Sequence, residues 1–164
     1  MSIISRNWAL NCCVISLSIW AGFASAETMP AGAKSMTADE IKALFAGKTY
    51  GFKEVGKDGV TRDVSWYLAS DGSMLGYAQN GPSFASGTWN ASEGKLCVST
   101  TWTGSWGTGQ ANDCQSLAED EKSSKKLYRA ETSKGKDFVA FRPTLHDGNS
   151  ITASIDALRK KLGK

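Results

Sequence analysis

Hydrophobic and polar residues alternate with a period of two along much of the chain between residues 48 and 142. In residues 95–102, Leu96, Val98 and Thr100 fall on one face and the residues between them on the other. Alternation of this kind, rich in β-branched residues, is typical of a strand with one buried face. Turn residues separate the alternating segments at intervals of about ten residues. The pattern therefore predicts antiparallel strands joined by short connections.

About eight strands are expected from this spacing. They span residues 49–55, 60–69, 73–79, 84–89, 95–102, 110–117, 126–132 and 137–142. Glycines such as Gly72 and Gly94 fall between strands, because glycine reaches the positive φ values that tight reversals need. The pattern predicts a mainly β fold, either a lipocalin-like antiparallel barrel or a bent sheet. A barrel of this size can be filled by side chains or can hold one small ligand.

One helix is expected on each side of the β-rich region. Thr37 and Glu40 form a capping box, so a short N-terminal helix begins there and ends near Gly47. After Pro143, apolar residues recur at helical spacing over residues 150–162, which predicts an amphipathic closing helix. Its last turn is basic and contains Arg159, Lys160 and Lys161. Cations in this position suit the helix dipole.

The N-terminal segment has a composition of its own. It holds one arginine, no acidic residue, an apolar run and small residues at Ala24 and Ala26. We interpret residues 1–26 as a secretory signal peptide cleaved after Ala26, and a lipoprotein signal is the alternative. Residues 27–35 are small and polar, as in a flexible leader. Residues 36–164 are long enough for one β-rich domain and too short for two.

The charge balance says little about partners. The whole chain has 19 Lys and Arg residues against 16 Asp and Glu residues, a formal net charge of +3. So small an excess does not indicate a nucleic-acid partner. An export signal followed by a single pair of cysteines is typical of an oxidising compartment. We expect a periplasmic or secreted protein with no stable membrane insertion after cleavage.

Cys97 and Cys114 are the two cysteines that remain after such a cleavage. The segment between them is long enough to let their strands pair antiparallel and bring the two thiols face to face. We predict a disulfide, which would stabilise the fold by about 3 kcal/mol in the chain-entropy model. Two free thiols or half of a metal site are the alternatives, although no CxxC motif or histidine pair accompanies the cysteines.

Few residues indicate catalysis. His146 is the only histidine, which excludes a His-based triad and a multi-histidine zinc site. With Asp147 and the Gly-Asn-Ser that follows, it is typical of a turn that leads into a helix. No serine lies in a GxSxG setting. We therefore expect no enzyme activity, no catalytic residue, no metal and no cofactor.

Trp102 and Trp106 flank a small polar segment that we expect to be a loop. Aromatic faces stack on sugar rings, so an exposed pair would form a carbohydrate-binding platform. The alternative is that Trp102 faces the core and Trp106 covers the open end of a barrel. We expect a non-catalytic binding or accessory protein of the cell envelope. A glycan, an envelope protein and a small apolar molecule are its candidate ligands.

A set of residues spread over the chain carries a resemblance to a family. The set is Thr37, Glu40, Ile41, Leu44, Gly47, Thr49, Asp71, Gly72, Gly87, Thr88, Trp89, Leu96, Cys97, Trp102, Cys114 and Tyr128. In these residues the chain resembles a domain-of-unknown-function family of small exported alphaproteobacterial proteins. The resemblance extends over nearly all of the mature chain, to about Phe141. It implies the compartment, a disulfide and a β-rich fold, and it implies no activity.

A weaker likeness is to the periplasmic lysozyme inhibitors, small barrels that plug an active site with a Ser-Gly-x-x-Tyr loop and a Thr-Lys-Gly loop. Here Ser86-Gly87 is followed by Thr88-Trp89, and Lys134-Gly135 follows an extra serine. The likeness implies that Ser86 and Lys134 belong to a surface that inhibits a lysozyme-like envelope hydrolase.

Overall fold

The computed structural model of the protein describes residues 28–55, 59–131 and 137–164. The predicted signal peptide, with Ala24 and Ala26, lies outside the described residues, and so does Lys134. In the described part of the chain, neither helix has the length and apolar character needed to cross a bilayer.

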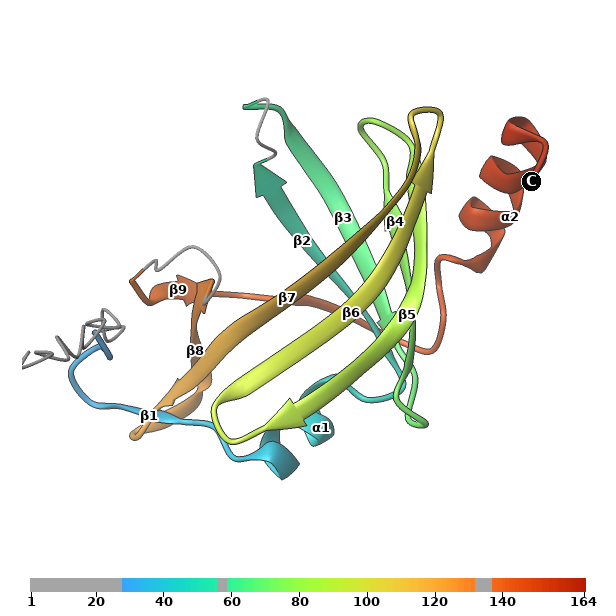
Figure 1. Ribbon diagram of the computed structural model, residues 1–164. Helices are drawn as coiled ribbons and strands as arrows, with labels where there is room; N and C mark the ends of the chain where they lie inside the picture. The colour runs from blue at the N-terminus through green and yellow to red at the C-terminus, as the bar shows by residue number, and fades with distance from the viewer. Residues whose placement is uncertain (1–27, 56–58, 132–136) are drawn as a thin grey trace, which may run out of the picture.

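In the described residues, ten strands form one antiparallel sheet that curls into a half-barrel (Figure 1). The strands are β1 (Ala33–Ser35), β2 (Lys48–Val55), β3 (Thr61–Leu68), β4 (Ser73–Ala78), β5 (Ser83–Ser92), β6 (Lys95–Gly104), β7 (Gly107–Asp120), β8 (Ser123–Glu131), β9 (Val139–Phe141) and β10 (Thr144–Asp147). The helices are α1 (Ala38–Phe45) and α2 (Thr152–Leu162). The prediction of a mainly β, bent antiparallel sheet with two helices is confirmed. The additional strands β1 and β10 are too short to show an alternating pattern in the sequence.

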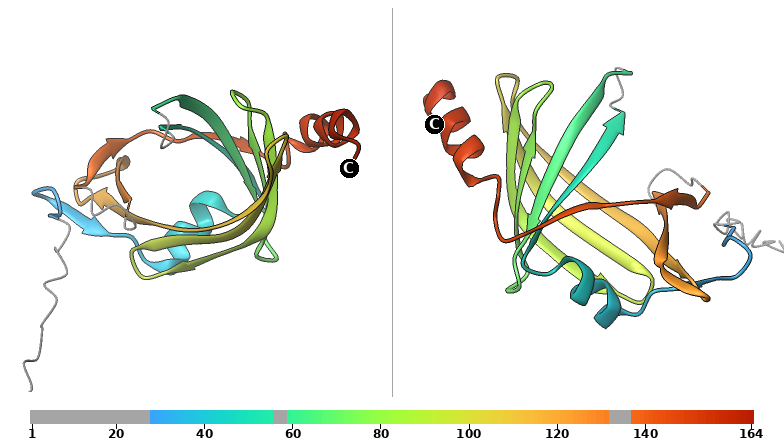
Figure 2. Two further views of the ribbon diagram at one scale, coloured as in Figure 1. Left: turned by 45° about the horizontal axis from the view of Figure 1, so that its top comes forward. Right: turned by 180° about the vertical axis from the view of Figure 1, so that it is seen from behind.

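The wall of the half-barrel is closed at one end only (Figure 2). The sheet order is β10-β2-β3-β4-β5-β6-β7-β8-β9, and β1 pairs with β7. Only residues 142–143 separate β9 from β10, so one extended segment passes from the last strand of the sheet to the first. However, β10 pairs only with residues 48–51 of β2, and β8 only with residues 115–120 of β7. Residues 52–55 and 107–114 therefore form two strand edges that no described strand covers.

Helix α1 fills the closed end. The predicted capping box is present: the Glu40 backbone N–H donates to Thr37 Oγ1 (3.2 Å), and the Thr37 backbone N–H donates to Glu40 Oε2 (2.7 Å). Ile41 and Phe45 are buried on the inner face of the helix. They belong to a core cluster that includes Met36, Tyr50, Leu68, Met74, Trp89, Leu96, Leu117, Leu127 and Phe141. Burial of these large side chains makes the closed end the main apolar core.

Residues 33–35 form β1, although their composition suggested part of a flexible leader. They pair with residues 118–120 of β7. Lys34 Nζ lies 2.9 Å from a carboxylate oxygen of Glu119. The chain is thus held against the sheet before α1 begins.

Residues 103–109 form a tight hairpin rather than the predicted loop. Gly104 pairs with Gly107, which leaves only Ser105 and Trp106 as the turn between β6 and β7. Gly107 has a φ of 111°, a value that a residue with a side chain rarely adopts. The glycines and small polar residues that suggested flexibility instead permit this reversal.

Cys97 and Cys114 lie directly opposite each other on β6 and β7 and form the predicted disulfide. Their neighbours Leu96 and Val98 are buried on the inner face. The disulfide therefore lies on the outer face of the sheet and fixes the register of two central strands.

Helix α2 packs on the outer face of the sheet rather than over an end of the barrel. Its Ile155 and Leu158 form a second cluster with Ile151 and with Phe84 of β5. Asn149 leads into the helix, because its Oδ1 accepts from the backbone N–H groups of Ile151 (3.1 Å) and Thr152 (3.2 Å). His146 and Asp147 do not belong to this turn as predicted. They pair with β2 as part of β10, since the closing strand extends further than the local pattern indicates.

The close approach of β5 and β6 predicts a severe effect of Gly87→Ala. A Cβ atom at Gly87 would overlap the carbonyl oxygen of Ser99 and lie 2.8 Å from Cα of Thr100. We expect the free energy of unfolding to fall by about 3 kcal/mol or more. Urea unfolding monitored by tryptophan fluorescence measures it.

Gly51→Ala is the matched control, because a Cβ there would meet no atom closer than 3.7 Å. It should change the free energy of unfolding by less than about 1 kcal/mol. Equal losses in the two variants would contradict the proposed clash.

Candidate functional site

A cleft of about 530 Å³ lies on the concave face of the open half of the barrel. Its walls come from both uncovered strand edges: Glu54 lies on β2 and Asp113 lies on β7. Glu131, at the end of β8, lies between them and the closed half. The volume falls within the range of about 300–1,000 Å³ that small-molecule sites have.

The floor of the cleft is aromatic. Phe52 and Trp66 meet edge to face with ring centroids 4.8 Å apart, and Tyr50 stacks behind Phe52 at 4.9 Å. Trp66 is 5% exposed, and its Nε1 has no hydrogen-bond partner among the described residues. By contrast, Nε1 of Trp89 in the core donates to the carbonyl of Ala69 (2.8 Å). An unpaired buried N–H is costly, so this indole lowers the stability of the fold beneath the cleft.

Trp102 lies across a row of small residues. Gly76, Ala85, Trp102 and Gly109 are successive cross-strand neighbours on β4, β5, β6 and β7. A Cβ atom at Gly76 would lie 3.1 Å from Cη2 of Trp102, so the indole covers that glycine. The side chain of Trp102 is half-buried and lines the cleft.

Trp106 lies on the same concave face, nearer the tip of the hairpin. Its Nε1 would lie 2.5 Å from a Cβ at Gly104, and its Cζ3 3.4 Å from a Cβ at Gly109. The indole therefore spans both glycines and lies against the sheet. Trp106 is 60% exposed and does not line the cleft. The structure brings the two candidate tryptophans to one face, but only Trp102 reaches the cavity.

The wall of the cleft is polar. Besides Glu54, Asp113 and Glu131, it contains Thr100 and Gln115, both buried. The Thr100 hydroxyl already donates to the carbonyl of Ala111 (3.1 Å). Carboxylates only accept hydrogen bonds when ionised, so this wall favours a ligand that donates them. In the described residues, no group of His, Cys, Asp and Glu side chains is arranged to hold a metal ion.

Arg129 lies beneath the cleft and fixes Tyr50. Its Nη1 donates to the Tyr50 hydroxyl oxygen (3.0 Å), and its guanidinium lies 5.0 Å from the ring centroid of Phe141. Burial raises the pKa of Tyr50 to about 12, and the nearby Arg129 cation opposes that shift. Tyr50 is therefore a neutral hydrogen-bond acceptor for Arg129 at physiological pH.

Ser86 is remote from this cleft. It lies within β5, paired with Leu75 and Thr101, and its side chain is exposed on the outer face. Ser86 thus lies in a strand between two others, as the alternation predicted for residues 84–89, and the inhibitory role that the likeness implies for it stays a prediction. Lys134, the second residue of the predicted inhibitory surface, lies outside the described residues.

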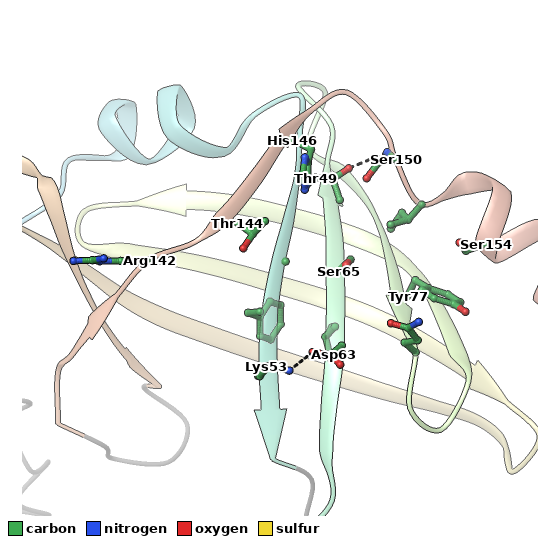
Figure 3. Close-up of a pocket in the computed structure, with 15 residues that line it drawn as sticks. Thr49, Lys53, Asp63, Ser65, Tyr77, Arg142, Thr144, His146, Ser150 and Ser154 are labelled. Atoms are coloured by element: carbon green, nitrogen blue, oxygen red, sulfur yellow. Dashed lines mark hydrogen bonds and ion pairs between the residues drawn. The ribbon is translucent and has the colours of Figure 1, made fainter.

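A second hollow, of about 680 Å³, lies on the outer face beside the start of α2 (Figure 3). His146 and Arg142 line it, and some of its other polar side chains already have partners. Thr49 Oγ1 donates to the carbonyl of Gly148 (2.7 Å), and Lys53 Nζ lies 2.6 Å from Asp63 Oδ1. The concave cleft is the better candidate for a binding site, because it combines an aromatic floor with a polar wall.

Sequence analysis identified Trp102 but missed Trp66, Glu54, Asp113 and Glu131. The sequence does contain a signal for Glu54. It follows Tyr50 and Phe52 at the inward-facing positions of one strand. A carboxylate at a core-facing position is unusual and indicates a functional site. Asp113 pairs with the buried Val98, but only the strand register shows this.

Comparison with known proteins gives a family and no relative of assigned activity. A family model described as "Protein of unknown function (DUF995)" matches residues 14–156. No curated protein and no solved structure matches the chain.

The raised pKa of Tyr50 predicts a loss of stability in alkali. An unfolded tyrosine has a pKa of about 10, so the folded state holds this proton more tightly. The resulting stabilisation is present below pH 10 and is lost as the pH rises toward 12. Since one pKa unit corresponds to about 1.4 kcal/mol, the loss should be roughly 2–3 kcal/mol.

Chemical unfolding of the wild type and of Tyr50→Phe at a series of pH values measures this effect. Between pH 10 and pH 12 the free energy of unfolding should fall less in Tyr50→Phe than in the wild type. Lysine residues also titrate in this range, but they do so in both proteins and cancel in the comparison. Parallel curves would contradict the assignment to Tyr50.

Proposed function

The chain belongs to the DUF995 family, whose description assigns no activity, and we propose that it is a non-catalytic binding protein for a small neutral sugar. The observation that carries the proposal is the composition of the concave cleft. One side presents indole rings, and the other presents carboxylate, amide and hydroxyl groups. Sugars combine apolar ring faces with many hydroxyl donors, and therefore complement both sides.

The polar wall distinguishes between classes of ligand. An apolar molecule in the cleft would remove water from the Glu54 carboxylate and give it no hydrogen bond in return, which costs free energy. An anionic molecule would face the carboxylates of Glu54, Asp113 and Glu131, whereas Arg129 lies behind the Phe52 ring. A neutral sugar can donate its hydroxyls to these carboxylates. Its ring face fits against Trp102.

The size of the cleft limits the ligand. A volume of about 530 Å³ suits a molecule of drug size, which for a carbohydrate means about two rings. The uncovered edges of β2 and β7 leave the cleft open at the side, so a longer glycan can enter by one end or by an internal segment.

We further propose that the protein acts in the periplasm or outside the cell. The Cys97–Cys114 disulfide is consistent with a non-cytoplasmic protein. The composition of residues 1–26 supports export. A lysozyme-inhibitor function has no such support, because Ser86 lies within the sheet rather than in a protruding loop.

Sugar binding is tested by titrating the chain from residue 27, which contains every described helix and strand. The ligands are cellobiose, maltose and diacetylchitobiose, and the readouts are calorimetry and tryptophan fluorescence. We expect at least one of them to bind and to be recovered unhydrolysed. Glu54→Gln should weaken binding by about tenfold, because it replaces a charge-assisted hydrogen bond with a neutral one.

Glu121→Gln is the matched control, because Glu121 is an exposed carboxylate in a turn at the closed end. It should leave the affinity unchanged. Failure of all three sugars to bind would refute a small-sugar site. An equal loss in the two variants would show that the cleft is not where the sugar binds.

A further inference from the structure

The open end of the half-barrel carries exposed apolar side chains. The described residues include four large hydrophobic side chains that are exposed, and three of them lie at this end. They are Val55 (60% exposed) at the end of β2, Val60 (47%) just before β3, and Trp106 (60%) in the turn between β6 and β7. Two hairpins thus carry exposed apolar side chains at this end, and one edge of the Trp106 indole also lies against the concave face.

The two complete hairpin tips at this end are uncharged. Residues 79–83 and 103–108 contain no Asp, Glu, Lys or Arg. The Arg62 side chain lies beside one of them, because a Cβ at Gly81 would lie 3.3 Å from its Nε. No carboxylate in these two tips would oppose an approach to a negatively charged surface.

Helix α2 adds positive charge at the same end. Its C-terminal end lies level with the hairpin tips, beside the half-barrel, in both Figure 1 and the right-hand view of Figure 2. Lys160, Lys161 and Lys164 are exposed there. Arg159 instead turns back, with its guanidinium 5.0 Å from the ring centroid of Phe84 and 3.6 Å from Asp156. The apolar face of α2 is buried on the sheet, so its outward face is mostly basic near the C-terminus.

The closed end has a different charge pattern. Its hairpin turns hold Asp71, Glu93, Asp120 and Glu121, together with Lys95 and Lys122. The exposed lysines of α2 therefore form a positive region at the open end, beside the carboxylates of Glu54 and Asp113 in the cleft. Such a region orients a protein in the field of a charged surface.

We propose that the open end docks peripherally on an anionic lipid surface. Trp106, Val55 and Val60 enter the headgroup region, where tryptophan is favoured, and the lysines of α2 contact the anionic headgroups. Lipid fits this end better than a folded protein does. Isolated apolar tips can each enter a fluid interface, whereas a protein interface needs a continuous, complementary patch.

Vesicle sedimentation tests the proposal with the chain from residue 27. The probes are vesicles of pure phosphatidylcholine and vesicles containing about one quarter phosphatidylglycerol. We expect binding to the anionic vesicles only, weakening as salt is added because salt screens exposed charges. Tryptophan fluorescence should shift to the blue on binding, and the shift should be smaller in Trp106→Ser. Trp106→Ser should also bind roughly tenfold more weakly.

A matched pair of charge variants locates the surface. One triple variant replaces three lysines of the α2 end with glutamine: Lys160, Lys161 and Lys164. Each replacement should weaken binding a few-fold, so the triple variant should bind on the order of 100-fold more weakly. Replacing Lys42, Lys95 and Lys122, which are exposed at the closed end, removes the same charge and should weaken binding only a few-fold. Equal losses in the two triple variants would overturn the proposed orientation. No binding to anionic vesicles would overturn the proposal itself, even if the cleft binds sugar.

Discussion

The concave face depends on one packing constraint, the alternation of very small and very large residues across four neighbouring strands. Gly76 and Ala85 lack the side-chain bulk that would lift the Trp102 indole off the sheet, and Gly109 does the same for Trp106. At Gly87 the constraint is stricter, because the backbone of β6 occupies the place of a side chain. These close approaches let a sheet of long strands curl and let its indoles form part of the inner surface. The curvature of these strands and the position of Trp102 in the cleft follow from them.

The half-barrel also shows how a small domain can combine a packed core with an unfilled cavity. At the closed end the chain passes from β9, which pairs with β8, to β10, which pairs with β2, so both edges of the sheet are hydrogen-bonded there. Helix α1 supplies apolar side chains that fill this end. The open end has neither, so its two strand edges and its aromatic floor remain accessible. Uncovered edges favour association between chains. The carboxylates of Glu54 and Asp113 beside these edges oppose that, since two copies would bring like charges together.

The sequence was sufficient for the features that local patterns encode. Alternation located the strands, Thr37 and Glu40 located the start of α1, and strand spacing paired Cys97 with Cys114. It was insufficient where the answer depends on contacts between distant segments. Leu145 pairs with Tyr50, and nothing near either residue indicates that partner. The same holds for the cleft: Glu54, Asp113 and Glu131 meet only because the sheet curls, so no local motif predicts them as a group.

The two proposed surfaces share one end of the molecule but have few residues in common. Glu54 and Trp66 lie inside the cleft, whereas Lys160 and Lys161 lie on a helix outside the sheet. Binding to lipid would therefore not occupy the cleft. It would instead hold the mouth of the cleft close to the surface, where sugars attached to the envelope are concentrated. A weak sugar site gains from such confinement, because the high effective concentration replaces intrinsic affinity. This relation explains how a cleft that is open at the side suffices for function, without the deep enclosure that a free sugar in solution would require.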